Sequence, residues 1–111
     1  MSSQIAVIVS SSDKDVVWTG LFYAIKGTKK QFMDDIRLVL WGPSEKIIAA
    51  DSELSGMVRE YLETGKPVWA CRTCADRYGV ARDMETLGCT VAYMGSLTAE
   101  WFKDGVIPFT W

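Results

Sequence analysis

The sequence predicts a three-layer α/β/α sandwich built on a mostly parallel five-stranded sheet. Short apolar runs alternate with segments of helical periodicity, and the first run is a β-branched stretch typical of a strand covered on both faces. Right-handed crossovers between such strands place helices on both faces of a parallel sheet. Since the 111 residues contain no linker or repeat, we expect a single domain over residues 1–111.

The first unit pairs a strand with an amphipathic helix. The strand is expected at residues 5–9, and residues 10–13 supply several candidate N-caps for the helix that follows. Apolar residues at i, i+3, i+4 and i+7 predict its packed face: Trp18, Leu21, Phe22 and Ile25. We therefore expect Trp18 in the core. Either Gly27 or the lysine pair at 29–30 ends this helix.

The second unit repeats the arrangement. A strand is expected at residues 36–41, followed by a helix with Gly42 as N-cap, proline at its first position and glutamate in its first turn. An apolar helical stripe then continues to Gly65 through Leu54, Met57, Val58, Tyr61 and Leu62. The pattern leaves open whether residues 51–52 divide this segment into two helices.

The rest of the chain adds three strands and their connections. The remaining elements are expected as a strand at 67–70, a helix from 71–74 to about 79, a short helix at 83–87, a strand at 89–94, a helix at 97–103 and a strand at 106–111. Pro108 has no amide donor, which indicates that the last strand lies at an edge of the sheet.

Composition excludes several classes of function. Lys and Arg number 12 against 14 Asp and Glu, a formal net charge of −2, so no nucleic-acid partner is expected. No apolar run approaches the ~20 residues of a membrane helix. The absence of histidine removes Ser-His triads, histidine bases and imidazole metal sites. Neither glycine-rich phosphate motif is present, and no cofactor or metal is expected.

The three cysteines indicate where the protein works. Their number is odd, and the chain starts without a basic segment and long apolar run typical of a secretory leader. We therefore expect a reducing compartment, the cytoplasm.

The carboxyl ends of the strands are the expected ligand site, because parallel α/β sheets bind ligands there. Only one segment at this end holds a reactive side chain, Cys71, where a strand turns into a helix. The helix dipole and a nearby arginine favour a thiolate at such a position. Residues expected to line the site are Ser10, Ser11, Gly42, Arg72, Thr73 and Gly95.

Cys74 completes a C-x-x-C spacing with Cys71, and three interpretations stay open. The two thiols could form a redox pair, or Cys74 could pack beneath the helix. A zinc site would need Cys89 and a carboxylate as further ligands, and no second paired motif supports it. Cys89 itself begins an apolar strand, so core packing is expected for it.

Two segments resemble the DsrE/DsrF-like family of sulfur-relay proteins. The Cys-Arg-Thr-Cys-Ala-Asp-Arg-Tyr-Gly-Val run at 71–80, after a Val-Trp-Ala strand, resembles that family's cysteine segment, and residues 40–46 resemble a second. The resemblance covers essentially the whole chain. It implies a trimer or hexamer in which Cys71 receives sulfane sulfur as a persulfide and passes it to a small partner protein. Cys74 departs from the family pattern.

The last eleven residues also favour a homo-oligomer. They contain Trp101, Phe102, Phe109 and Trp111. An edge strand this apolar invites pairing unless another subunit covers it.

The function predicted from these residues is sulfur carriage by a persulfide on Cys71, with Cys74 as a supporting or resolving thiol. Two alternatives are weighed beside it. One is a non-catalytic oligomeric module that binds or regulates, and the other is a dithiol oxidoreductase that uses both thiols.

Overall fold

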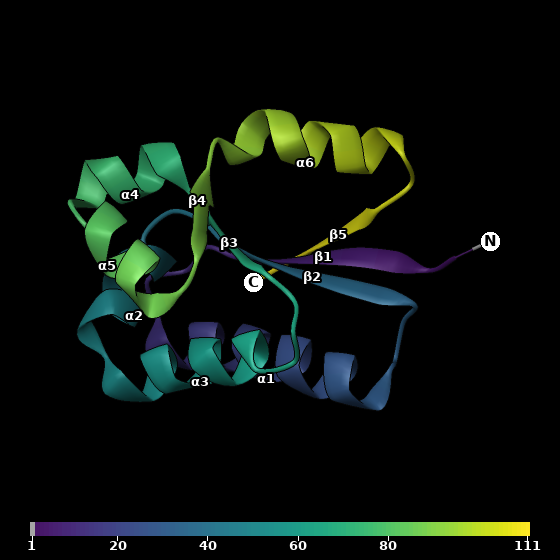
Figure 1. Ribbon diagram of the computed structural model, residues 1–111, viewed down its shortest axis with the longest axis horizontal. Helices are drawn as coiled ribbons and strands as arrows, with labels where there is room; N and C mark the ends of the chain where they lie inside the picture. The colour runs from purple at the N-terminus through teal and green to yellow at the C-terminus, as the bar shows by residue number, and fades with distance from the viewer. Residues whose placement is uncertain (1) are drawn as a thin grey trace.

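The computed structural model describes residues 2–111 as one sheet with helices on both faces (Figure 1). Its five strands are all parallel, in the order β4-β3-β2-β1-β5. The predicted three-layer fold is therefore confirmed. The elements are β1 (Gln4–Val9), α1 (Lys14–Lys30), β2 (Asp35–Leu40), α2 (Ser44–Ala50), α3 (Ser52–Leu62), β3 (Val68–Cys71), α4 (Arg72–Tyr78), α5 (Ala81–Leu87), β4 (Thr90–Ala92), α6 (Met94–Lys103) and β5 (Ile107–Thr110).

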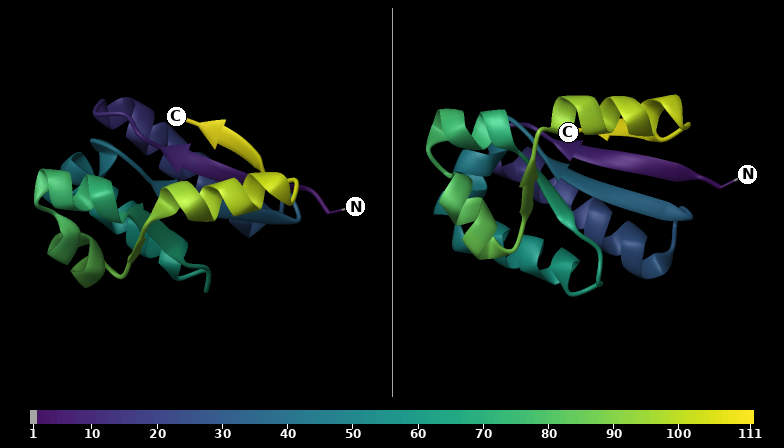
Figure 2. Two further views of the ribbon diagram at one scale, coloured as in Figure 1. Left: turned by 90° about the horizontal axis from the view of Figure 1, so that it is seen from above. Right: turned by 45° about the horizontal axis from the view of Figure 1, so that its top comes forward.

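The direction of the crossovers divides the helices between the two faces. The chain steps the same way across the sheet from β1 to β4, so right-handed connections place α1 and α3 on one face. The return from β4 to β5 runs the opposite way and places α6 alone on the other face (Figures 1 and 2). Helices α2, α4 and α5 gather around the carboxyl ends of the strands, at the left of Figure 1. No helix of residues 2–111 has the length and apolar character needed to cross a membrane.

Two apolar cores lie on the two faces of the sheet. Alternate residues of β1 divide between them, because successive side chains of a strand point to opposite sides. The larger core, under α1 and α3, takes Ile5, Val7 and Val9. The smaller core, under α6, consists of Ala6, Val39, Cys71, Met94, Trp101 and Val106. Cys71 is thus packed on the face that a single helix covers.

The packed face of α1 matches the predicted one in part, since Leu21 and Ile25 are buried but two other predicted residues are not. Trp18 and Phe22 are 37% and 45% exposed and stack on each other with ring centroids 5.1 Å apart, so the expectation of Trp18 in the core is wrong. The face that meets the sheet includes Gly20 and Gly27 instead. A Cβ on Gly27 would lie 2.6 Å from the Ile36 side chain, so this close approach of helix and sheet requires glycine.

The helix ends are set by local hydrogen bonds. Helix α1 continues past Gly27 to Lys30 and ends at Gln31, which adopts the left-handed conformation with φ 54°. Asp51 divides the second unit into two helices. It ends α2, and its carboxylate accepts the N–H groups of Glu53 and Leu54 at the start of α3.

Several boundaries move relative to the prediction: α5 starts two residues early, β4 is shortened to Thr90–Ala92, and the other strands shift by a residue. Two further changes, at the starts of α2 and α6, have a visible cause. Helix α2 starts at Ser44 with Pro43, not Gly42, as its N-cap, because Gly42 adopts φ +64° to turn the chain out of β2. Helix α6 starts at Met94, three residues early, where that side chain is fully buried in the smaller core.

The aromatic C-terminal segment divides between core and surface. Strand β5 is an edge strand, as its proline predicts, and all four of its residues are exposed. Trp101 is buried in the smaller core, and Trp111 packs against Gly20 of α1. These two tryptophans therefore pack within their own chain, whereas Phe102 and Phe109 remain exposed.

Candidate functional site

Cys71 is held at the junction between sheet and helix. It is the last residue of β3 and the N-cap of α4, with an extended backbone at φ −70° and ψ 123°. The parallel pairing of β3 with β2 and β4 fixes its position, since Cys71 itself aligns with Ala92 of β4. Its side chain is 5% exposed, so a reagent must enter the smaller core to reach the sulfur.

Cys74 lies in the first turn of α4 and interacts directly with Cys71. Burial raises the pKa of Cys74 to about 11, although the Gly42 N–H that donates to its sulfur opposes this shift. A hydrogen bond to Cys71, and the charge that Cys71 can carry, raise the pKa of Cys74 further. At neutral pH Cys74 is therefore a thiol that donates its S–H to the Cys71 sulfur. Both are free cysteines.

Two of the predicted lining residues meet next to this thiol pair. Gly42 donates to Cys74, and a Cβ on Gly42 would lie 3.4 Å from the carbonyl oxygen of Ser10. The ends of β1 and β2 thus converge on the first turn of α4. The Ser10 Oγ is used elsewhere, because it donates to the carbonyl of Trp111 at 3.2 Å.

The other four predicted lining residues make different contacts. Ser11 caps the turn before α1 by accepting an N–H at 2.9 Å. Arg72 forms an ion pair with Asp76 at 3.8 Å, which directs its charge along α4. Thr73 and Gly95 are exposed in the first turns of α4 and α6. The hydrogen bonds and ion pairs found for these four residues do not involve the two sulfurs.

Glu45 is the residue that sequence reasoning missed. It lies in the first turn of α2, where an acidic residue is ordinarily exposed and favoured by the helix dipole. Here its side chain is 0% exposed, and neither carboxyl oxygen has a hydrogen-bond partner. Burial raises its pKa to about 8, and its charge raises the pKa values of Cys74 and Cys89. The one sequence signal was its spacing, three residues before the buried Ile48.

Ser44 explains why this carboxyl points inward. Its buried Oγ lies 2.6 Å from the carbonyl oxygen of Val9 and 2.9 Å from that of Trp41, and its proton is shared between them. These contacts fasten the start of α2 to the ends of β1 and β2. The next residue, Glu45, is consequently held beneath the helix.

Cys89 is a core residue, as the sequence predicts. It is 7% exposed in the larger core, and burial raises its pKa to about 12. Among residues 2–111, no three Cys, Asp or Glu side chains are grouped so as to hold a metal ion. The zinc alternative therefore has no support in the described part of the chain.

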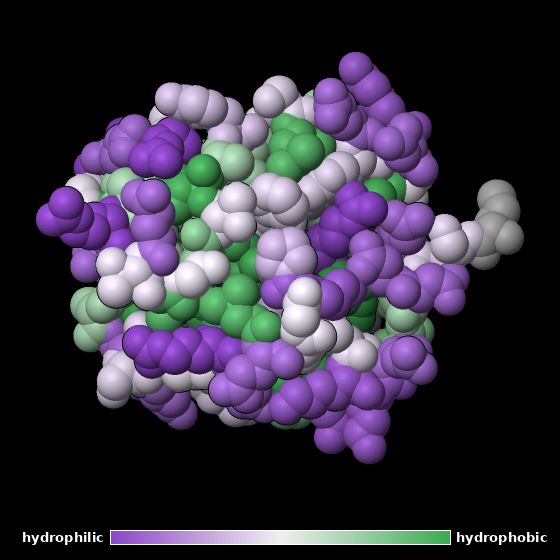
Figure 3. Space-filling view, viewed as in Figure 1, coloured by the Kyte–Doolittle hydropathy of each residue, from purple (hydrophilic) through white to green (hydrophobic). Residues whose placement is uncertain are grey.

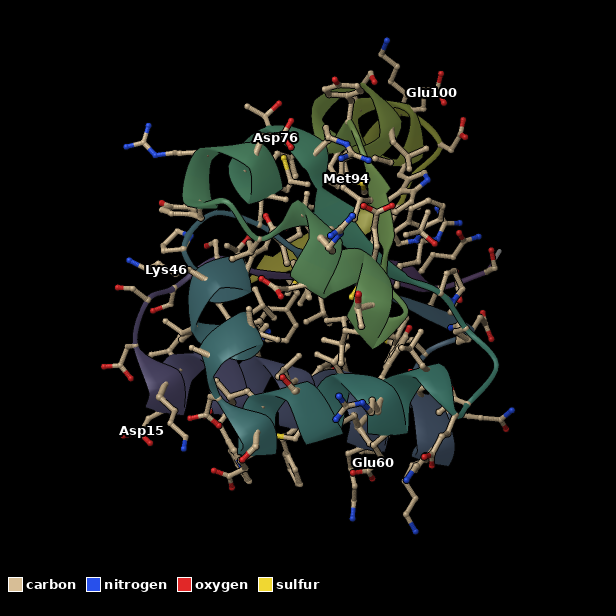
Figure 4. The ribbon with its side chains drawn as sticks, turned by 60° about the vertical axis from the view of Figure 1, so that its left-hand side comes forward. Asp15, Lys46, Glu60, Asp76, Met94 and Glu100 are labelled. Carbon is tan, nitrogen blue, oxygen red and sulfur yellow. The ribbon has the colours of Figure 1, made fainter. Side chains whose placement is uncertain are left out.

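The start of α6 covers the thiol pair from one side. Met94 is fully buried and packs in the same apolar cluster as Cys71, with Cys74 at its margin. Figure 4 shows Met94 at the start of α6, beside the helix α4 that carries Asp76. Met94 is thus one of the side chains that cover Cys71 on this face of the sheet.

The fold and site together define an α/β sandwich with a buried cysteine, a half-buried cysteine and a buried carboxyl at the carboxyl ends of its strands. Comparison with protein-family models and with curated proteins gives no match. The solved structures that share the fold include the following two. A conserved protein of unknown function from Bacteroides thetaiotaomicron, BT1422, is 29% identical with a TM-score of 0.90, over 98% of this chain and 95% of that chain. The YchN protein of E. coli is 20% identical with a TM-score of 0.72, over 97% and 99%.

Proposed function

We propose that this protein is a sulfur carrier in which Cys71 holds a sulfane sulfur as a persulfide. The observation that carries the proposal is the thiol pair. Cys74 stays protonated at neutral pH, and its S–H group donates a hydrogen bond to the Cys71 sulfur. Cys71 accepts this hydrogen bond at the N-cap of α4, and we assign it as the nucleophile of the pair.

The transfer consists of two exchange reactions at sulfur. The Cys71 thiolate attacks the outer sulfur of a donor persulfide, a Cys71 S–S bond forms, and the donor leaves as its own thiolate. A thiolate of the recipient then attacks the outer sulfur on Cys71 and releases Cys71 as a thiolate. Each step exchanges one S–S bond for another, so no external oxidant or reductant is consumed.

Three finer features belong to the same proposal. The resemblance to the DsrE/DsrF-like family supports sulfur relay and a small protein as donor or recipient. The same resemblance, with the exposed apolar edge of β5, supports a homo-oligomer of three or six chains. Free thiols support a reducing compartment such as the cytoplasm.

A dithiol oxidoreductase is the second candidate. The direct interaction of Cys71 with Cys74 favours it, because two thiols in contact can form a disulfide. In that case the pair would lose two hydrogens to a substrate and hold no added sulfur.

Mass spectrometry after incubation with inorganic polysulfide separates these functions. We expect one added sulfur on Cys71, retained in Cys74→Ser and abolished in Cys71→Ser while circular dichroism shows an intact fold. A Cys71–Cys74 disulfide in the natural protein, together with no sulfur added to Cys71 in Cys74→Ser, would establish the oxidoreductase. An unmodified Cys71 would leave the non-catalytic binding module as the function.

A further inference from the structure

Glu45 is an unusual residue to find inside this domain. It is the only Asp, Glu, Lys or Arg buried among residues 2–111, and both carboxyl oxygens lack a hydrogen-bond partner. An unpartnered polar group in a protein interior is destabilising, and each one in a native fold calls for an explanation. The sulfur-carrier mechanism described above does not use this carboxyl.

The surroundings of Glu45 connect it to one thiol of the pair. Helix α2 packs against α3, α4 and α5. A negative charge on Glu45 raises the pKa of two thiols near these helices. They are Cys74 of α4 and Cys89, which precedes β4. The charged residues of α3, α4 and α5 are at least partly exposed, so none of them is buried beside the carboxyl. The turn before α2 also holds Cys74 through the Gly42 N–H.

We propose that Glu45 is a positioning residue that controls the proton of Cys74 and thereby the release of sulfur from Cys71. The inference rests on the proposed sulfur-carrier function. Helix α2 packs against α4, and a charge on the buried Glu45 disfavours a second negative charge on the half-buried Cys74, so Cys74 ionises more readily while Glu45 is neutral. At neutral pH the carboxyl is protonated, which leaves Cys74 free to react when Cys71 carries a sulfur.

The release step balances without an external redox partner. The Cys74 thiolate attacks the Cys71 sulfur of the persulfide, the Cys71–Cys74 disulfide forms, and the outer sulfur leaves as hydrosulfide. The two cysteine sulfurs are oxidised to a disulfide, and the sulfane sulfur is reduced to hydrosulfide. The proton lost by Cys74 goes to the hydrosulfide. A small-molecule thiol, as reductant, returns the disulfide to two thiols in a later step.

Ionisation of Glu45 should therefore limit this release at alkaline pH. A thiolate reaction ordinarily speeds up about tenfold per pH unit below the thiol pKa. In the natural protein the increase should flatten above about pH 8, the pKa of Glu45, because the new charge raises the pKa of Cys74. The uncharged Glu45→Gln variant should keep the full increase.

The test measures hydrosulfide release between pH 6 and 10 from protein loaded with polysulfide. At pH 9 we expect release from Glu45→Gln to be about threefold or more faster than from the natural protein, with equal loading on Cys71. Cys74→Ser should show no intramolecular release. Identical pH profiles for the natural protein and Glu45→Gln would overturn the role of Glu45 and leave sulfur carriage intact.

A second measurement does not depend on sulfur transfer. In Cys71→Ser, the rate of Cys74 alkylation by iodoacetamide is followed against pH with and without Glu45→Gln. We expect the apparent pKa of Cys74 to be lower when Glu45 is replaced, and an unchanged pKa would refute the inference. If the amide variant fails to fold, Glu45→Met removes the carboxyl and its unpartnered oxygens together. Absence of loading on Cys71 would refute the carrier function alone.

Discussion

At the scale of single residues, the buried carboxyl of Glu45 should make stability depend on pH. Its pKa is about 8 in the folded protein against an ordinary 4.5, so the folded state holds a proton that the unfolded state has lost between these values. The free energy of unfolding should therefore fall as pH rises from about 4.5 to 8, by up to ~1.4 kcal/mol per pH unit. Glu45→Gln should lack this contribution.

Urea unfolding at pH 5, 6.5 and 8 checks this expectation. The stability difference between the natural protein and Glu45→Gln should move in favour of the variant as pH rises. The matched control is Glu53→Gln, since Glu53 occupies the first turn of α3 but is exposed and pairs with Lys14. Parallel curves for the natural protein and Glu45→Gln would show that the carboxyl is ionised in the fold.

At the scale of elements, two helical glycines should respond in opposite ways to alanine. A Cβ on Gly20 of α1 would lie 2.9 Å from the Trp111 ring and 3.0 Å from Val9, whereas one on Gly56 of α3 meets nothing within 4 Å. Alanine improves helix propensity by about 1 kcal/mol, but overpacking costs about 1–3 kcal/mol. We expect Gly56→Ala to stabilise the fold by about 1 kcal/mol and Gly20→Ala to destabilise it by about the same amount.

Chemical denaturation of the two variants measures these changes side by side. The pair is informative because both changes add one methyl group to a helix interior. If Gly20→Ala stabilised the protein as much as Gly56→Ala, the predicted clash of a Cβ on Gly20 with Trp111 and Val9 would be refuted.

At the scale of the whole molecule, the apolar surface is distributed unevenly. Strand β5 lies at the far edge of the sheet, opposite β4 (Figure 2). Ile107 and Phe109 on this edge are 60% and 40% exposed, and Phe109 meets Tyr23 of α1 with ring centroids 5.2 Å apart. The face nearer the viewer is mainly hydrophilic, with an apolar band between α5 and α3 (Figure 3). The β5 edge is therefore the surface that we expect a second copy to cover.

Light scattering at micromolar concentration tests the expected homo-oligomer. Ile107→Lys places a charge on the exposed edge and should release monomers with an unchanged circular dichroism spectrum. Lys103→Ala, an exposed change beyond the strand, is the control and should leave the assembly intact. A natural protein that scatters as a monomer would refute the prediction. Truncation is a poorer test, because Trp111 packs within its own chain.

The sequence by itself determined the alternation of strands and helices and the position of Cys71. Apolar runs and helical periods are local patterns, and the switch from one to the other lies within a few residues of Cys71. The edge position of β5 followed from Pro108 alone, since a missing amide donor is a property of the residue. The Asp51 carboxylate divides α2 from α3 by an equally local cap, but the pattern did not distinguish a cap from a continuing helix.

Only the tertiary structure decided which side chains the site contains. The spacing that predicted Trp18 in the core could not show that α1 approaches the sheet through Gly20 and Gly27, because this depends on Trp111 and Ile36, far away in the sequence. From the sequence, Glu45 is expected to be an exposed acid in the first turn of a helix. In the structure, the hydrogen bonds of Ser44 hold α2 against the ends of β1 and β2, and the Glu45 carboxyl lies inside. Periodicity reports which residues share a face, whereas burial and charge depend on what that face meets.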